Sequence, residues 1–119
     1  MTKRGLSVNS RAKGARGERE LAAILREHGY DARRGQQFSG ANGDADVIGL
    51  EGIHIECKLR DRLNIEDAYA QARRDADRRG EIPTVMHRKT GDKHKCGWLV
   101  TMSLEHFMHL YKAWEREND

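Results

Sequence analysis

The sequence has little of what defines several large classes of protein. It contains two cysteines and one proline in 119 residues, and aromatic residues make up 6% of the chain. Two isolated cysteines, Cys57 and Cys96, do not form the framework of a secreted disulfide-rich domain, and they suit a chain kept reduced inside the cell. No apolar run approaches the length of a transmembrane helix or the core of a signal peptide. We therefore expect a soluble, cytoplasmic protein without a membrane partner.

Apolar residues are also scarce relative to charged ones. Hydrophobic residues make up 37% of the chain and charged residues 34%. A chain of this length has room for one small hydrophobic core. Residues 1–13 are basic and polar, without a periodic apolar face, and are predicted to form a flexible basic arm. We expect residues 14–119 to form a single domain.

The positive charge is mild overall but gathered in a few stretches. The net charge is +3 and the isoelectric point about 9.0. The clustered basic residues are Lys3, Arg4, Arg11, Lys13, Arg16, Arg19, Arg33, Arg34, Arg73, Arg74, Arg78 and Arg79. Such clusters suit a polyanion, because phosphates neutralised by Lys and Arg release condensed counterions. They equally suit exposed helix faces that pair with nearby acids.

Apolar periodicity predicts three helices. The first spans about residues 15–28 and stops at Gly29. The second spans about residues 65–79, with Asn64 as its cap and Gly80 at its end. The third follows Ser103 and carries an apolar face.

Five β-rich stretches separate these helices: "YDARR", "ADVIGL", "GIHIECKL", "IPTVMHRK" and "CGWLVTM". The second and third flank a turn at Glu51 and Gly52, which predicts an antiparallel hairpin. The order α-β-β-β-α-β-β-α predicts an α/β domain with a mixed five-stranded sheet flanked by helices.

Acidic and basic side chains share one face of the third predicted strand. Glu56 and Lys58 are two residues apart, so both point to the same side of the sheet. The hairpin brings Asp46 to about the same level on the neighbouring strand. Two carboxylates and a backbone carbonyl, for which Cys57 is the candidate, are ligands that suit Mg²⁺. A lysine beside the ion could orient or help deprotonate an attacking water, so the pattern indicates a phosphodiester as the substrate.

Each of these residues also has an ordinary structural explanation. A cross-strand salt bridge accounts for Glu56 and Lys58, Asp46 could cap a strand, and Glu18 could simply favour a helix start. The conjunction of Glu18, Asp46, Glu56 and Lys58 in that order is what favours a metal site.

This order resembles the PD-(D/E)XK nuclease superfamily, and within it the archaeal-type Holliday junction resolvases. The resemblance rests on "KGARGEREL", "GYDARR", "DVIGL", "IECK", "GEIPTVMHRK" and "GWLVTMS", and it covers residues 13–103. It implies a restriction-endonuclease-like fold. The superfamily's usual proline before the first acid is replaced by Ala45.

The resemblance also assigns roles residue by residue. Asp46 and Glu56 resemble the family's metal-binding acids, Lys58 its catalytic lysine, and Glu18 its helix glutamate, which reaches the metal through water. The residues expected to contact DNA are Lys13, Arg16, Arg19, Arg34, Ser39 and Gln71. Gln71 could equally be a solvated helix residue.

The implied function is a Mg²⁺-dependent endodeoxyribonuclease, with Mn²⁺ as a possible substitute and no nucleotide cofactor. It would resolve four-way DNA junctions as a homodimer, through in-line attack of a metal-bound water that leaves 5′-phosphates. Two alternatives stay open: a phage or mobile-element nuclease on branched or duplex DNA, and a catalytically silent DNA-binding module.

The histidines and the second cysteine offer one further possibility. His94, Cys96, His106 and His109 could be interpreted as a zinc site, but their spacing fits no common zinc module. Trp98, Trp114 and Phe107 are expected in the core or in a subunit interface.

Overall fold

The computed structural model describes residues 3–35, 45–91 and 96–119, with side chains from residue 12 onwards in these ranges. In chain order the elements are α1 (Lys3–Glu27), β1 (Arg33–Arg34), β2 (Val47–Ile48), β3 (Ile53–Leu59), α2 (Ile65–Arg79), β4 (Ile82–Arg88), β5 (Leu99–Thr101) and α3 (Leu104–Glu117). The predicted α/β order is confirmed.

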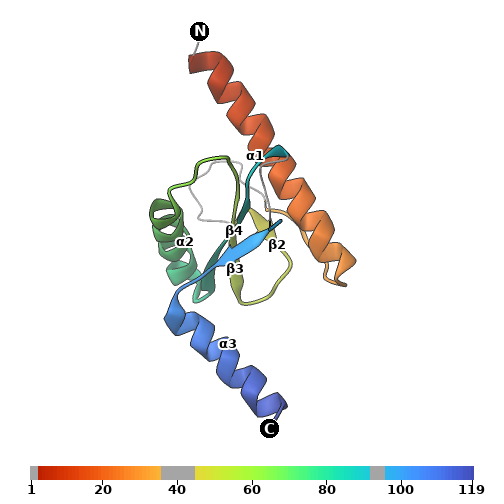
Figure 1. Cartoon of the computed structure of the whole chain (residues 1–119), viewed down its shortest axis with the longest axis vertical. Coiled ribbons are helices and arrows are strands. Elements are labelled where there is room, and N and C mark those ends of the chain that lie inside the picture. The colour runs from red at the N-terminus through yellow and green to blue at the C-terminus, as the bar shows by residue number, and fades with distance from the viewer. Residues whose placement is uncertain (1–2, 36–44, 92–95) are drawn as a thin grey trace.

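The strands form one mixed sheet whose spatial order is the same as their order in the chain, β1-β2-β3-β4-β5 (Figure 1). Only β3 and β4 run parallel among these neighbours, and the other pairs are antiparallel. A parallel pair needs a crossover connection, and α2 provides it between β3 and β4. The predicted hairpin at Glu51 and Gly52 is confirmed, because β2 and β3 are antiparallel and Ile53 N donates to Leu50 O at 3.0 Å.

Helices cover both faces of the sheet, α1 on one side and α2 on the other. Ile55 and Cys57 pack with Leu21 of α1. On the opposite face, Ala68 and Ala72 of α2 pack on Val85 of β4. Glu56 lies beside Val85 in the parallel register, so its side chain leaves the sheet toward α2. The alternation of β3 thus separates an apolar face under α1 from a polar face under α2.

The first helix is longer than the sequence predicts. It begins at Lys3 instead of near residue 15, so residues 3–13, expected to belong to a flexible basic arm, are helical. The chain's only proline is at position 83, so none interrupts a helix in this stretch. Whether residues 1–13 act as a separate arm stays a prediction.

The other helix boundaries follow the predicted caps. The Asn64 side chain accepts a hydrogen bond from Asp67 N, and Gly80 ends α2 in the left-handed conformation with φ 66°. The Ser103 side chain accepts one from His106 N. These local signals fix where α2 and α3 begin.

Helix α3 stands away from the rest of the protein and ends far from the N-terminus (Figure 1). None of its residues is buried. Its exposed apolar side chains are Leu104, Phe107, Met108, Leu110, Tyr111 and Trp114. Exposed Leu99 and Val100 extend this apolar surface onto β5. We refer to these eight residues as the α3 face.

No helix in the described part of the chain is both long enough and apolar enough to cross a membrane.

Candidate active site

The hairpin of β2 and β3 brings the two predicted metal-binding acids to the same level. Val47 pairs with Ile55, so Asp46 lies next to Glu56 across the strands. Asp46 Oδ2 accepts a hydrogen bond from Cys57 N at 2.8 Å, and Asp46 N donates to Ile55 O at 3.0 Å. These bonds fix the Asp46 carboxylate against the backbone of β3.

Glu56 is an almost fully buried carboxylate, with 3% of the residue exposed. Its Oε2 lies 3.7 Å from Lys58 Nζ, and its Oε1 lies 3.6 Å from His54 Nε2. A buried carboxylate normally needs a partner close by. Lys58 and His54 are such neighbours of the buried Glu56 carboxylate, and its role as a metal ligand stays a prediction.

Cys57 separates the two faces, as the alternation of β3 predicts. Its thiol belongs to the apolar core under α1. Burial raises the pKa of this thiol, and the nearby negative charges of Asp46 and Glu18 raise it further. The thiol is thus a neutral core group. The role of the Cys57 carbonyl as a metal ligand stays a prediction.

Glu18 reaches the site from α1 through a close helix-to-strand contact. Gly17 packs so tightly on β3 that an added Cβ would lie 2.9 Å from Leu59 Cβ. This contact brings the next residue, Glu18, near the C-terminal end of β3. Arg34 Nε donates to Glu18 Oε1 at 2.9 Å, so β1 also holds this carboxylate.

A cavity of about 530 Å³ opens between α1 and the end of β3. Its lining includes Glu18 and Lys58, together with Lys13, Arg60 and Arg62. The Lys58 side chain is 17% exposed and the Glu18 side chain 14% exposed. A polyanionic backbone that enters this cavity would meet basic groups, with Glu18 and Lys58, two of the four candidate catalytic residues, at its wall.

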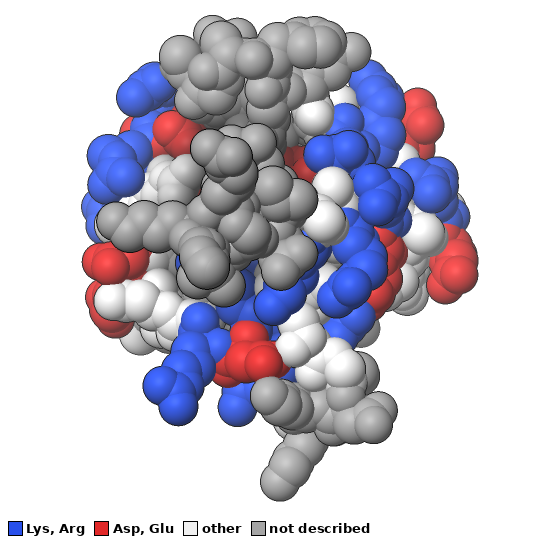
Figure 2. Space-filling view, turned by 90° about the horizontal axis from the view of Figure 1, so that it is seen from above, with Lys and Arg blue, Asp and Glu red and all other residues white. Residues whose placement is uncertain are grey.

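The residues expected to contact DNA are not all in one place. Lys13 lines the cavity, and Arg16 and Arg19 are exposed on α1. Gln71 is exposed on α2, which leaves both interpretations of this residue open. Ser39 lies outside the described residues. Viewed from above, toward the N-terminal end of α1, Lys and Arg side chains spread widely over the described surface with acids between them (Figure 2).

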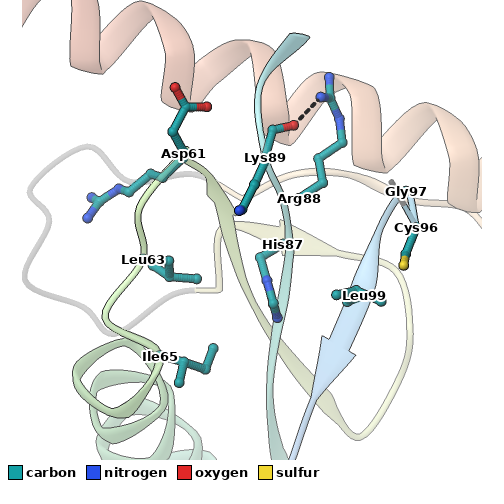
Figure 3. A pocket seen from close by; sticks show the side chains of 10 residues that line it. Asp61, Leu63, Ile65, His87, Arg88, Lys89, Cys96, Gly97 and Leu99 are labelled. Atoms are coloured by element: carbon teal, nitrogen blue, oxygen red, sulfur yellow. Dashed lines mark hydrogen bonds between the residues drawn. The ribbon is translucent and has the colours of Figure 1, made fainter. Parts of the chain in front are cut away.

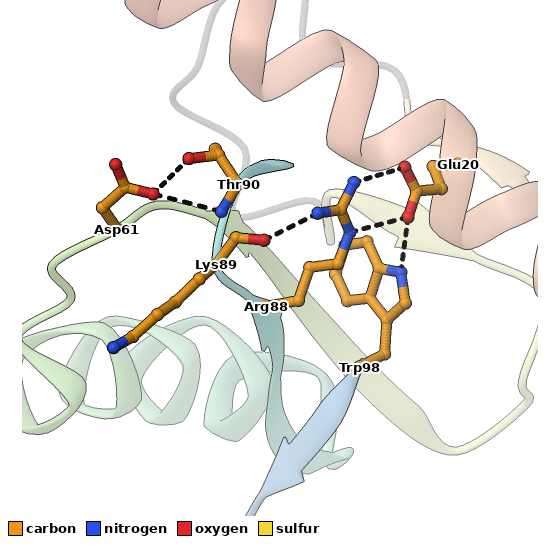
Figure 4. A network of polar contacts seen from close by, with 6 residues as sticks. All are labelled: Glu20, Asp61, Arg88, Lys89, Thr90 and Trp98. Atoms are coloured by element: carbon orange, nitrogen blue, oxygen red, sulfur yellow. Dashed lines mark hydrogen bonds and ion pairs between the residues drawn. The ribbon is translucent and has the colours of Figure 1, made fainter. Parts of the chain in front are cut away.

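A polar network clamps α1 onto β4 and onto the segment before β5 (Figure 4). Arg88 Nε and Nη2 each donate to the Glu20 carboxylate at 2.7 Å, and Trp98 Nε1 donates to it at 2.8 Å. The Arg88 guanidinium lies 5.7 Å from the Trp98 ring centroid. The hydrogen bonds from Arg88 are the main cause that lowers the pKa of Glu20. Because Glu20 is two residues from Glu18, this clamp also fixes α1 over the site.

A second cavity, of about 460 Å³, lies between the loop after β3 and β5 (Figure 3). His87 lies within it between Leu63 and Leu99, and His87 Nε2 is 2.9 Å from Thr101 Oγ1. Burial lowers the pKa of His87, which favours a neutral ring. The candidate catalytic acids are not among its lining residues.

Sequence reasoning missed His54, which is completely buried. Its Nε2 faces Glu56, its Nδ1 lies 3.6 Å from Glu81 Oε1, and Asp75 of α2 is close to both His54 and Glu56. Burial alone would lower the pKa of His54, but the carboxylates of Glu56, Asp75 and Glu81 outweigh it and raise the pKa. One signal was available: His54 is two residues before Glu56 and so shares its face of β3.

The alternative zinc site does not form among the described residues. His106 Nδ1 is 2.9 Å from Ser103 Oγ, and the ring centroids of His106 and His109 are 6.2 Å apart. Within the part of the chain that the structure describes, the group able to hold a metal through three His, Cys, Asp or Glu side chains is His54, Glu56 and Asp75. His94 lies outside the described residues. Trp98 packs on the core under α1, while Trp114 and Phe107 remain exposed.

The chemistry of the donor set fits a hard divalent cation. Asp46 and Glu56 lie side by side on neighbouring strands, and among the described residues the buried Glu56 carboxylate has Lys58, His54 and Asp75 near it. Carboxylate and carbonyl oxygens are the ligands that Mg²⁺ and Mn²⁺ accept.

Comparisons with known proteins identify the family and support the fold. No curated protein sequence matches the chain. The solved structure of a Holliday junction resolvase from the archaeal hyperthermophile Archaeoglobus fulgidus is similar, with a TM-score of 0.54 and 23% sequence identity. The match covers 76% of this chain and 72% of that one, and it supports the fold. Residues 9–73, more than half of the chain, match the family model described as archaeal Holliday junction resolvase. The chain therefore belongs to the archaeal Holliday junction resolvase family, a family of nucleases.

Proposed function

We propose that this protein is a Mg²⁺-dependent endodeoxyribonuclease that resolves four-way DNA junctions by paired phosphodiester hydrolysis as a homodimer, with 5′-phosphate products. The observation that carries the proposal is the placement of Asp46, Glu56 and Lys58 on one hairpin, with Glu18 brought to the same end of β3 by α1. Membership of the family makes a junction the expected substrate.

The metal ligands in this proposal are Asp46, Glu56 and the Cys57 carbonyl, with Glu18 contributing through water. A Mg²⁺ ion held there would polarise the scissile phosphate and lower the pKa of an attacking water, and Mn²⁺ would serve in its place. The bond from Cys57 N holds the Asp46 carboxylate, and the bond from Arg34 holds Glu18. The ligands are thus oriented before DNA arrives, which is how a fixed site lowers a reaction barrier.

Lys58 is the candidate for orienting the attacking water. Its ammonium is 3.7 Å from Glu56 Oε2 and lines the cavity that would receive the backbone. An ammonium donates three hydrogen bonds, so one can remain with Glu56 while others reach water or a phosphate oxygen. An ammonium has no free electron pair, so Lys58 would orient the water and the proton from the water would pass to solvent.

Contacts to the DNA backbone are assigned to Lys13, Arg16, Arg19 and Arg34, with Ser39 and Gln71 as further candidates. Basic side chains that bind phosphates fix the position of DNA without reading its sequence. We therefore propose that the protein recognises the shape of a junction.

The homodimer is proposed on the α3 face. The exposed fractions of Leu104 and Trp114 are 75% and 58%, and the helix that carries them buries none of its own residues. An exposed apolar surface of this kind marks an interaction site more often than a free surface. A two-fold dimer would present two active sites to two strands of one junction.

Both cysteines are unpaired, so the proposed compartment is the cytoplasm, which keeps thiols reduced.

The test uses purified protein, Mg²⁺ and three DNA substrates with shared sequence: a four-way junction, a flap and a linear duplex. The proposal predicts paired nicks in the junction, little cleavage of the duplex, and no product from Glu56→Ala. Equal cleavage of the duplex would contradict junction selectivity. Absence of metal-dependent cleavage of every substrate would favour a DNA-binding module.

A further inference from the structure

His54 is buried without a hydrogen-bond partner on either ring nitrogen. Its side chain is 0% exposed, and its two nitrogens each lie 3.6 Å from a carboxylate oxygen, Nε2 from Glu56 Oε1 and Nδ1 from Glu81 Oε1. A distance of 3.6 Å is longer than a hydrogen bond to an imidazole nitrogen. A polar side chain this deeply buried normally makes hydrogen bonds, so the lack of a partner for both nitrogens of His54 needs a physical cause.

The groups around His54 are arranged as ligands of one ion. One ligand atom each from His54, Glu56 and Asp75 lies within 4.8 Å of the others. Zinc binds histidine nitrogen and carboxylate oxygen at about 2.0–2.2 Å, so neighbouring ligands of a tetrahedral ion are about 3.3 Å apart. The 3.6 Å between His54 Nε2 and Glu56 Oε1 is close to that spacing.

We propose that His54, Glu56 and Asp75 form a second metal site, between β3 and α2, which holds a divalent transition-metal ion such as Zn²⁺. The site combines a buried imidazole without a hydrogen-bond partner, a carboxylate from the same strand, and a carboxylate from the helix that packs on that strand. With three protein ligands, a fourth position stays available for water.

Glu81 supplies the outer partner that a metal-binding histidine usually has. When Nε2 binds an ion, Nδ1 carries the proton and needs an acceptor, which is most often a carboxylate or a carbonyl. Glu81 Oε1 lies on the Nδ1 side of His54. Glu81, His54 and a bound ion would follow the order of a carboxylate–histidine–zinc arrangement once the 3.6 Å between Glu81 Oε1 and His54 Nδ1 shortens to a hydrogen bond.

The imidazole separates this site chemically from the proposed Mg²⁺ site. Magnesium prefers oxygen ligands only, whereas imidazole favours zinc and the later first-row ions. The two sites share Glu56, whose Oε1 faces His54 and whose Oε2 faces Lys58. The bound ion would therefore hold the Glu56 carboxylate in one orientation. An effect of this orientation on catalysis rests on the proposed function, whereas binding of the ion to His54, Glu56 and Asp75 does not.

The test is titration of the purified protein with Co²⁺, whose visible absorption reports a tetrahedral site, followed by displacement with Zn²⁺. We expect one Co²⁺ per chain, displaced by one Zn²⁺. His54→Gln and Asp75→Asn should each weaken binding at least about 100-fold, and Glu81→Gln about 10–100-fold, as expected for an outer partner. The matched control is Asp77→Asn, which removes an exposed acid from the same helix and should leave binding unchanged.

Two further variants keep the interpretation clear. The titration is repeated in Cys96→Ser, because the exposed thiol of Cys96 could bind the probe. Asp46→Asn should lose cleavage but retain the Co²⁺ spectrum, which separates this site from the catalytic one. Circular dichroism checks that each variant is folded, and a rise in melting temperature with Zn²⁺ should occur in the wild type and be absent in Asp75→Asn.

Absence of a stoichiometric Co²⁺ spectrum in the folded wild type would overturn the proposal, and so would a spectrum unchanged in both His54→Gln and Asp75→Asn. In that case His54 is a buried imidazole among the carboxylates of Glu56, Asp75 and Glu81, and no ion binds there. Cleavage without ion binding at His54 would refute the second site alone, and ion binding without cleavage would refute the proposed function alone.

Discussion

The close approach of Gly17 to β3 makes a quantitative prediction about how α1 is placed. A Cβ at position 17 would lie 2.9 Å from Leu59 Cβ and 3.7 Å from Cys57 Sγ. Leu59 Cβ is attached directly to the strand backbone and cannot turn away, so Gly17→Ala must push the helix off the sheet. Gly14 is the matched control, because it lies in the same helix and a Cβ there would meet nothing within 4 Å.

Two effects of known size compete in these variants. Replacing Gly with Ala inside a helix stabilises the fold by about 0.5–1 kcal/mol. Overpacking a filled core costs about 1–3 kcal/mol. Gly14→Ala gains only the first effect, so its free energy of unfolding should rise by about 0.5–1 kcal/mol. Gly17→Ala has both the stabilising helix effect and the overpacking cost. Because the helix effect is the same in the two variants, the free energy of unfolding of Gly17→Ala should be about 1–3 kcal/mol lower than that of Gly14→Ala.

Urea unfolding followed by circular dichroism measures this difference, provided that both variants show one transition with the same slope. Cleavage by Gly17→Ala should also fall, because Glu18 moves with the helix. Unfolding free energies that agree within about 0.5 kcal/mol would refute the packing of α1 on Leu59.

The remaining predictions concern the clamp and the α3 face. Arg88→Met removes the paired hydrogen bonds at 2.7 Å to a partly exposed Glu20, so we expect a loss of about 1–3 kcal/mol in urea unfolding, and an unchanged stability would contradict the clamp. Because the pKa of Glu20 is lowered in the folded protein, its ionised carboxylate stabilises the fold. This contribution is complete above the ordinary pKa of 4.5 and is lost as the pH falls through the lowered pKa of the folded protein. Arg88→Met lacks most of this contribution, so acidification should reduce its free energy of unfolding less than that of the wild type. Trp114→Glu should convert dimer to monomer in light scattering, whereas Arg116→Ala, on the other side of α3, should not; a wild-type protein that is already monomeric would refute self-association through the α3 face.

Local signals were enough to predict the elements that carry the candidate site. Asn64, Gly80 and Ser103 mark helix ends through contacts within a few residues, and the turn at Glu51 and Gly52 fixes the antiparallel pairing of β2 with β3. That pairing sets Asp46 beside Glu56, because a hairpin leaves little freedom in the register.

Long-range packing accounts for what the sequence did not predict. The Glu20 and Arg88 pair joins residues 68 positions apart, and nothing near either one marks the partner. His54 was missed for the same reason. Its neighbours Asp75 and Glu81 are distant in the sequence, and the crossover through α2 brings them close to it. The early start of α1 was missed because basic and polar residues without an apolar stripe suggest irregular chain, although nothing in them prevents a helix.

The central claim is that Asp46 and Glu56 form a metal site that cuts junction DNA, and one measurement tests it most directly. Wild type and Asp46→Asn are compared for Mg²⁺-dependent cleavage and for binding of the same four-way junction. Asparagine keeps an oxygen that can accept the hydrogen bond from Cys57 N, so the fold should be retained. The account predicts that Asp46→Asn binds the junction as the wild type does and that its cleavage rate falls by at least about 100-fold, since one charged ligand of the ion is gone. A variant that cleaves the junction at the wild-type rate would contradict it.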